Sequence, residues 1–204
     1  IGPRREGQRI FNETCPHYLV YNNTRMDECG AFAKCNPPLR PEENREQLWK
    51  HMLAGDIDII GTDHGPYSKK EKMEASNIWD ALPGFGGVEL MLPVMLTEGY
   101  QKRNMNLSRI AKVTSSNAAK IFGLKNKGVI QVGKDADFAI VDLKKSWIYD
   151  GLKSFSKTKL DNGIFEGYKS SATICETIVR GNTVYKDGDI IANSGYGIFI
   201  PRQV

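Results

Sequence analysis

The order of the elements predicted for the first third of the chain limits the fold more than any other feature. Residues 9–14 (RIFNET) and 56–63 (DIDIIGTD) are short runs with β-branched or aromatic residues, typical of strands. A helix is predicted between them, with Pro41 in its first turn and Gly55 at its end. Four residues form its apolar face: Leu48, Trp49, Met52 and Leu53. Strand, loop, helix and strand in this order predict a parallel βα repeat, and therefore an α/β fold.

The segments around this repeat carry weaker signals. Residues 15–17 (CPH) are expected to turn out of the first strand, and residues 18–35 to form a connecting loop of mixed polarity. Residues 68–87 are expected to form a second polar loop. Apolar periodicity then predicts helices over residues 88–103 and 107–122.

The character of the chain changes after the second of these helices. From Gly128 onward, β-branched runs alternate with the turn sequences KDAD, RGN and KDGD, a pattern typical of antiparallel strands. We therefore predict a boundary near residues 123–128. This boundary separates an α/β segment, residues 1–122, from a small β unit, residues 123–204.

Composition narrows the classes of function. The formal net charge of the 204 residues is only +4, and basic and acidic residues alternate in runs such as EENREQLWK and KKEKMEAS. Such runs are typical of solvated helix faces, so we expect no nucleic-acid partner. No apolar run approaches the ~20 residues that span a bilayer, so we expect no membrane partner.

The cysteines indicate the cellular compartment, and the first residues indicate a helix end. The four cysteines, Cys15, Cys29, Cys35 and Cys175, lack CxxC spacing and are interpreted as reduced thiols, which points to the cytoplasm. A zinc site on two of them, Cys15 and Cys35, is the less favoured alternative to buried small hydrophobic side chains. The opening IGPRREG, without methionine, resembles the charged last turn of a helix that starts before this sequence.

The best candidates for chemistry are Asp63 and His64, at the end of the second predicted strand. The loops that follow the carboxyl ends of strands carry the chemistry in parallel α/β folds, and both TCPHY and TDHGPY are such loops. The alternative is structural, because an aspartate followed at three residues by Pro66 also suits a helix N-cap. The residue pattern alone leaves both interpretations open.

Six motifs, in this order, resemble one family: ETCPHYL, KCNPPLR, GTDHGPY, SSNAAKIFGL, KGVIQVGKDADFAIVDL and ETIVRGNTVYKDG. Together they resemble the C-terminal half of the cyclic-amide hydrolases of the amidohydrolase superfamily, which include allantoinase, hydantoinase (dihydropyrimidinase) and dihydroorotase. The resemblance implies the C-terminal part of a (β/α)8 TIM-like barrel, strands 7 and 8 with the helices that follow. It also implies that residues 123–204 are strands of a small β-sandwich domain.

The resemblance also implies a reaction and a cofactor. Family members open a cyclic amide or ureide ring with two divalent metal ions, usually zinc, one of whose ligands is a carboxylated lysine. Asp63 matches the aspartate at the end of the eighth barrel strand, which binds metal and acts as the catalytic proton carrier. A carboxylate beside divalent ions stays ionised and can still accept a proton transiently, so the residue type suits this role.

Substrate contacts follow from the same resemblance. Asn36, before the paired prolines, and Pro83 with Gly84 match residues that bind the cyclic amide, largely through the main chain. His64 is expected to contact substrate or to support the metal ligands, and Tyr67 stands where dihydroorotases carry histidine. Pro83 stands where hydantoinases carry asparagine. Neighbouring stretches such as QKRNMNLSR are most similar to allantoinase, and the subgroup stays open.

The other two histidines are not expected to bind metal. His17 lies in the segment that matches the seventh strand, which has no ligand in this family, so a hydrogen-bonding or packing role is expected. His51 is expected to be an ordinary surface residue.

The chain does not contain the family's remaining metal ligands. It has three histidines and no His-x-His pair, so we expect these residues alone to be an inactive fragment of a hydrolase that is a dimer or tetramer. The competing hypothesis is an amidohydrolase-like scaffold protein without catalysis.

Overall fold

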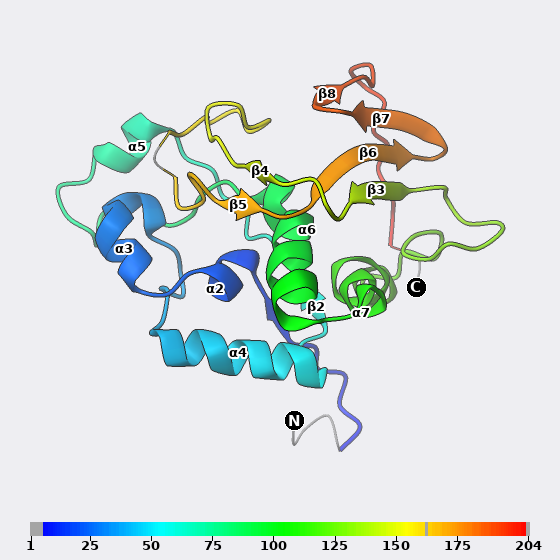
Figure 1. Ribbon diagram of the computed structural model, residues 1–204, viewed down its shortest axis with the longest axis horizontal. Helices are drawn as coiled ribbons and strands as arrows, with labels where there is room; N and C mark the ends of the chain where they lie inside the picture. The colour runs from blue at the N-terminus through cyan, green and yellow to red at the C-terminus, as the bar shows by residue number, and fades with distance from the viewer. Residues whose placement is uncertain (1–5, 162, 203–204) are drawn as a thin grey trace.

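The computed structural model describes residues 6–161 and 163–202 (Figure 1). The helix end predicted at the start of the chain falls mainly on residues outside these ranges. Within them, no helix combines the length and apolar character needed to cross a bilayer. Strands and helices are mixed along the chain, so the predicted α/β class is confirmed.

The two predicted strands pair side by side in parallel. β1 (Glu13–Thr14) and β2 (Ile59–Ile60) are aligned so that Glu13 lies opposite Ile59. Both are shorter than predicted, but the pairing extends through Asn12, whose backbone N–H donates to the Asp58 carboxylate at 2.7 Å. Because the strands are parallel, the segments that follow them emerge at the same edge.

The segment between these strands contains more helix than expected. The chain leaves the strand at residues 15–17, as predicted, but it does so by entering a short helix, α2 (Pro16–Val20), in which the Tyr18 N–H donates to the Cys15 carbonyl at 3.2 Å. The expected loop over residues 18–35 also contains α3 (Thr24–Cys29) and a 3₁₀ turn, η1 (Gly30–Ala33). Helix α3 begins where the Asn22 side chain accepts a hydrogen bond from the Thr24 backbone N–H at 3.0 Å. Local side-chain hydrogen bonds of this kind start turns without any apolar periodicity.

The predicted amphipathic helix is α4 (Glu42–Ala54), ended by Gly55 with a left-handed φ of 94°. Pro41 immediately precedes it rather than lying in its first turn. Trp49 and Met52 are buried, at 1% and 0% exposure, whereas Leu53 is 47% exposed, so its inclusion in the apolar face was wrong.

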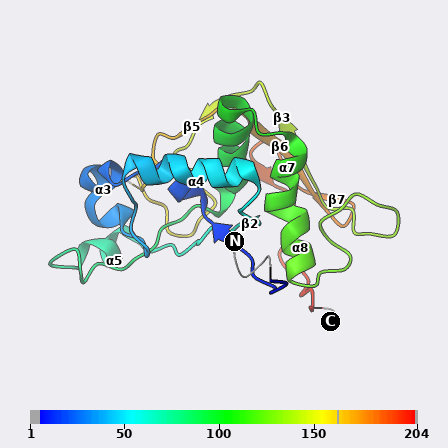
Figure 2. The ribbon, with the colours of Figure 1, turned by 90° about the horizontal axis from the view of Figure 1, so that it is seen from below.

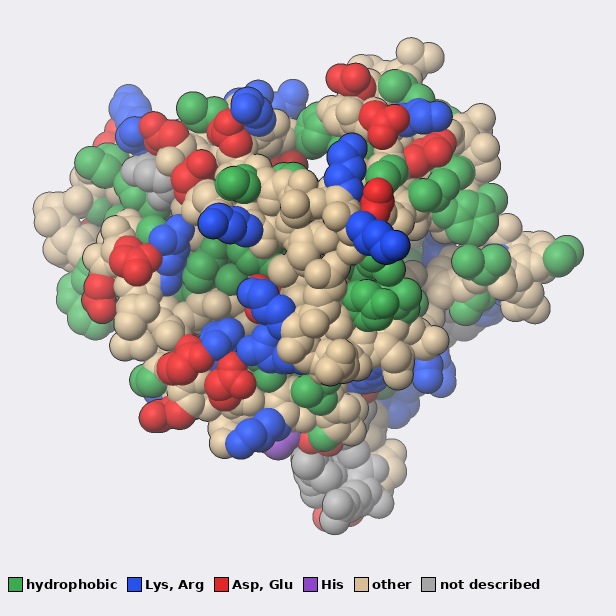
Figure 3. All heavy atoms as spheres, in the orientation of Figure 1, with side chains coloured by type: hydrophobic (Ala, Val, Ile, Leu, Met, Phe, Trp, Pro, Cys, Tyr) green, Lys and Arg blue, Asp and Glu red, His purple; other side chains and the backbone are tan. Residues whose placement is uncertain are grey.

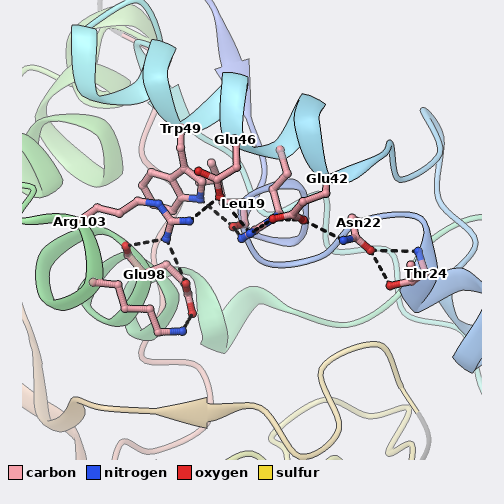
Figure 4. A network of polar contacts seen from close by, with 10 residues as sticks. Leu19, Asn22, Thr24, Glu42, Glu46, Trp49, Glu98 and Arg103 are labelled. Atoms are coloured by element: carbon pink, nitrogen blue, oxygen red, sulfur yellow. Dashed lines mark hydrogen bonds and ion pairs between the residues drawn. The ribbon is translucent and has the colours of Figure 1, made fainter.

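A polar network joins α4 to the helical segment around residues 95–103 (Figure 4). The Trp49 indole N–H donates to the Leu19 carbonyl at 2.8 Å, and the Arg103 guanidinium lies 4.4 Å from the centre of the Trp49 ring. Arg103 also forms ion pairs with Glu46 and with Glu98, which is 4% exposed. The buried carboxylate is thereby matched by a cation and hydrogen bonds, as burial of a charge requires.

Two helical segments follow, each containing a stretch of π-helix. The first is made of η2 (Val88–Leu90), α6 (Met91–Val94) and η3 (Met95–Gln101). The second is made of α7 (Leu107–Ala111), η4 (Lys112–Ser116) and α8 (Asn117–Ile121), and the Asn106 side chain caps it. Both predicted helices are therefore confirmed. In Figure 2, the α7–α8 segment runs crosswise to α4.

The C-terminal part of the chain is built mainly from strands. A four-stranded antiparallel sheet has the order β3-β6-β7-β8, and β4 pairs with β5 separately. The bounds are β3 Phe138–Asp142, β4 Trp147–Ile148, β5 Lys169–Ser170, β6 Thr173–Val179, β7 Asn182–Lys186 and β8 Asp189–Ile190. Arg180-Gly181 and Asp187-Gly188 all have positive φ, as two-residue hairpin turns require, which confirms the turns predicted from RGN and KDGD.

Two hydrophobic clusters form the core of the described residues. One contains Trp49, Met52, Met95 and Ile110 between α4 and the two later helical segments. The other includes Ile164, Phe165 and also Phe85, which belongs to the loop that follows α5 (Lys69–Met73). On the face seen in Figure 3, basic and acidic side chains are interspersed.

Candidate functional site

Asp63 lies three residues beyond β2, at the edge where the parallel strands end. It is exposed and has a φ of 49°, in the left-handed region that non-glycine residues seldom adopt. Aspartate and asparagine tolerate this conformation better than other residues because their side chains bond locally. Backbone of this kind is common at functional sites, where surrounding contacts hold it.

The Asp63 carboxylate contributes to the pKa shifts of two buried thiols and one partly buried hydroxyl. Burial and, to a smaller extent, the Asp63 carboxylate together raise the pKa of the Cys15 thiol to about 12. Burial likewise raises the pKa of the Tyr18 hydroxyl and of the Cys35 thiol, with a smaller contribution from the same carboxylate. The Gly61 N–H donates to the Thr14 carbonyl at 2.9 Å, so the segments that follow β1 and β2 start side by side at the same edge of the pair.

The segment around Asn36 is joined to the segment after β1. The Tyr18 hydroxyl donates to the Pro37 carbonyl at 2.6 Å, and the Cys35 thiol lies 3.3 Å from the same oxygen. The Asn36–Pro37 peptide is cis, and the Asn36 side chain is exposed. Asn36 therefore stands on a turn that Tyr18 connects to the end of β1.

His64 contacts the glycine-rich loop that contains Pro83 and Gly84. Its Nδ1 atom accepts hydrogen bonds from the backbone N–H groups of Gly87 and Val88, at 3.1 and 3.3 Å. An Nδ1 atom that accepts leaves the proton of a neutral imidazole on Nε2. The N–H of Gly65 donates to the Phe85 carbonyl at 3.2 Å. The loop after Asp63 and the glycine-rich loop are thus held together by backbone and ring contacts.

Gly84 lies where three segments meet. Its N–H donates to the Lys34 carbonyl at 2.9 Å, and its φ is 128°. A Cβ atom at this position would lie 2.8 Å from the Gly65 carbonyl oxygen and 3.4 Å from a ring carbon of Tyr67. The residue therefore has to be glycine, both for its backbone conformation and for the space available.

Replacing Gly84 with alanine is expected to destabilise the protein by about 1–3 kcal/mol, because the added methyl group meets backbone and the positive φ becomes strained. Denaturant unfolding measures this change. Gly133 is a matched control, because its φ is 86° but a Cβ there meets nothing within 4 Å. Gly133→Ala should therefore show only the cost of the backbone conformation, and equal effects of the two variants would contradict the steric argument.

The other two histidines have different environments, one buried and one at the surface. His17 is 1% exposed and packs edge-on against Phe85, with ring centres 4.9 Å apart, and burial lowers its pKa to about 4. The expected packing role is confirmed, but Nε2 is buried without a hydrogen-bond partner among the described residues. His51 is a surface residue, as expected, and pairs with Asp56 at 2.7 Å.

The described part of the chain does not by itself make a metal site. No group of three or more histidine, cysteine, aspartate or glutamate side chains there is arranged to hold an ion. The cysteines are all free thiols, and Cys15 and Cys35 are buried at 8% and 2% exposure. A metal ion held at Asp63 would therefore need further ligands from outside the described residues.

One residue of this region was missed. The run KKEKMEAS predicts a solvated helix face, but Lys72 within it is 0% exposed. Its neighbours Lys69 and Lys70 are exposed and pair with Asp161 and Glu74, which fits the prediction for them. Composition does not distinguish three lysines on a short helix, so only the tertiary contacts of Lys72 set it apart.

Comparisons with known proteins agree with this arrangement. Residues 16–184 match the amidohydrolase family. An allantoinase of Escherichia coli O139:H28 is 38% identical over 202 residues, which are 98% of this chain and 44% of the relative. An allantoinase of Salmonella newport is 38% identical over 182 residues, 89% of this chain and 39% of the relative.

Solved structures give the same result. An L-hydantoinase (dihydropyrimidinase) from Arthrobacter aurescens superposes with a TM-score of 0.91 and 32% identity, covering 98% of this chain and 45% of that one. A D-hydantoinase from Thermus sp. superposes with a TM-score of 0.90 and 27% identity, covering 98% and 44%. The chain spans less than half the length of these relatives. A family match over most of its residues shows that the chain belongs to the amidohydrolase family.

Proposed function

We propose that the whole protein hydrolyses a small cyclic amide or ureide, and that this chain contributes part of its active site. The observation that carries the proposal is the position of Asp63. It lies exposed at the carboxyl-end edge of the parallel pair, in a left-handed backbone conformation, at the edge where the segment that contains Tyr18 also leaves its strand. Similarity to allantoinases and hydantoinases supports the reaction class.

Asp63 is proposed to have two roles, as ligand and as proton carrier. Two bound divalent ions, zinc in this proposal, would supply an activated water and polarise the carbonyl, with a carboxylated lysine and the other ligands outside this chain. The Asp63 carboxylate takes a proton from the attacking water as its oxygen bonds to the amide carbon. It then gives this proton to the ring nitrogen as the C–N bond breaks, so the ring opens to an acid and an amine or urea nitrogen.

The substrate is proposed to lie against the segments around Asp63. Backbone groups of Asn36, Pro83 and Gly84 bind the cyclic amide, and the Tyr67 ring and the His64 Nε2–H face it. The contacts that support this are those joining the loops: Gly84 to Lys34, and His64 to Gly87. Ring substrates need such convergent donors and acceptors to be oriented.

We propose that residues 1–122 are strands 7 and 8 of a (β/α)8 barrel with their helices, and that residues 123–204 are strands of a β-sandwich domain. The parallel pairing of β1 with β2 supports the first assignment, and the antiparallel sheet β3-β6-β7-β8 supports the second. Two parallel strands leave edges that need partners, so the remaining strands of both units come from other residues. The whole protein is proposed to be a homodimer or homotetramer.

The test is an assay of the whole protein with added zinc or manganese on allantoin, hydantoin, dihydroorotate and dihydrouracil. Turnover of at least one substrate, lost on chelation of the metal, is the expected result, with allantoin favoured by the similarity to allantoinases. The 204 residues alone should give no turnover under the same conditions, because Asp63 is one ligand of several. No turnover by the whole protein, together with no bound metal, would instead favour the scaffold hypothesis.

A further inference from the structure

Lys72 is a fully buried lysine, at 0% exposure. Lysine is almost never buried without partners, because its ammonium loses hydration. The Nζ atom donates hydrogen bonds to the carbonyl of Leu82 at 2.7 Å and to the carbonyl of Ala31 at 3.2 Å. It also lies 5.7 Å from the centre of the Tyr67 ring, within the range of a cation–π contact.

The local sequence directs Lys72 toward these partners. Helix α5 starts immediately after Tyr67 with a capping box: the Ser68 hydroxyl accepts from the Glu71 N–H, and the Glu71 carboxylate accepts from the Ser68 N–H at 2.7 Å. The box defines where the helix begins, and therefore which of its residues face inward. Lys72 faces inward, while Lys69 and Lys70 on the same helix have side chains 56% and 85% exposed.

The three partners of Lys72 belong to three separate segments of the proposed substrate site. Tyr67 belongs to the loop after Asp63, Leu82 directly precedes Pro83, and Ala31 lies in η1, which leads into Asn36. A further hydrogen bond, from the Gly84 N–H to the Lys34 carbonyl, joins the second segment to the third. The Lys72 ammonium group therefore contacts all three segments.

We propose that Lys72 is a positioning residue that sets the spacing of the three substrate-binding segments, a role that rests on the proposed function. Lys72 does not touch substrate. It acts through the Leu82 carbonyl on Pro83 and Gly84, through the Ala31 carbonyl on the Asn36 segment, and through its charge on the Tyr67 ring. Removing it should weaken substrate binding more than it slows the chemical step, since Asp63 is positioned by β2.

The charge of Lys72 gives the proposal a second readout. Burial lowers its pKa to about 8; the Lys34 ammonium acts in the same direction, and the Cys35 thiol opposes it. As pH rises through this value the ammonium loses its proton. Its hydrogen bonds then lose their charge assistance, and the attraction to the Tyr67 ring disappears. Substrate binding should therefore weaken on the alkaline side.

The experiment uses the whole protein and compares Lys72→Met with Lys70→Met, which removes an exposed lysine from the same helix. With the substrate that the wild type turns over, we expect KM to rise about tenfold or more in Lys72→Met while kcat changes less than about threefold. Lys70→Met should match the wild type. An unchanged KM in a folded Lys72→Met variant would overturn the proposal, even if its melting temperature fell.

A pH series covers the case in which Lys72→Met does not fold. In the wild type and in Lys70→Met, KM should rise between about pH 7 and about pH 9.5, whereas in Lys72→Arg it should stay flat, because arginine keeps its charge. The same rise in Lys72→Arg as in the wild type, or no rise in the wild type, would overturn the proposal.

Amide hydrogen exchange separates this proposal from the proposed function. If the wild type hydrolyses none of the four cyclic amides, the proposed function fails and the role of Lys72 in substrate positioning fails with it. Exchange in peptides covering residues 30–36 and 81–86 then reports only whether Lys72 holds the segments together. If the wild type is active but exchange and KM in Lys72→Met equal those in Lys70→Met, the proposed function stands and the positioning role is wrong.

Discussion

Replacing Asp63 with asparagine is expected to lower kcat/KM of the whole protein by about a thousandfold or more, equivalent to about 4 kcal/mol of transition-state stabilisation. Asparagine keeps the size of the side chain and tolerates the left-handed φ of 49° at this position. It removes the carboxylate, and with it both the proposed metal ligand and the proposed carrier of the proton. Steady-state kinetics measure the loss, and metal analysis of the purified variant should show less bound metal than the wild type.

Asp56→Asn is the matched control. Asp56 precedes the same strand, and its carboxylate pairs with the surface residue His51 at the end remote from the site. We expect this variant to retain wild-type kcat/KM and metal content. If Asp63→Asn kept more than about a tenth of the wild-type activity, Asp63 would be neither an essential ligand nor the proton carrier.

Replacing Trp49 with alanine is expected to cost about 3–5 kcal/mol of the free energy of unfolding. Trp49 is 1% exposed in the core cluster with Met52 and Met95. The substitution leaves a cavity and removes both the hydrogen bond to the Leu19 carbonyl and the surface on which the Arg103 guanidinium stacks. Urea unfolding followed by circular dichroism measures the loss.

Leu53→Ala, one turn further along the same helix, is the control for this prediction. Leu53 is 47% exposed, so its truncation should change the free energy of unfolding by only about 0.5 kcal/mol. Similar losses in the two variants would contradict the packing argument, because alanine favours the helix at both positions and only burial distinguishes them.

Much of the local structure could be predicted because it depends on residues close in sequence. Gly55 ends α4 in the left-handed conformation that its sequence position predicted. The RGN and KDGD turns have the positive φ values that short hairpins need. In contrast, the helix α3 escaped prediction because it starts from a side-chain hydrogen bond of Asn22 and lacks an apolar stripe.

Only some residues of the candidate site could be predicted from the local sequence pattern. Asp63 and His64 stand directly after a strand, and this position marks them in the sequence. The resemblance to a family is the only reason to assign Asn36, Pro83 and Gly84 to the site, since nothing in their local sequence pattern indicates one. Their assignment to substrate stays a prediction, although the structure brings Gly84 against Lys34 and Tyr67.

The sequence by itself determined the membership in a hydrolase family, the βα order and the acid at the strand end, because motifs and periodicity are properties of neighbouring residues. Only the tertiary structure decided which charged residues are buried. Lys69, Lys70 and Lys72 are equivalent in composition, yet Lys72 alone among them is enclosed by carbonyls that lie 41 and 10 residues away along the chain. Burial of a charge depends on contacts between distant segments, and local sequence carries no record of them.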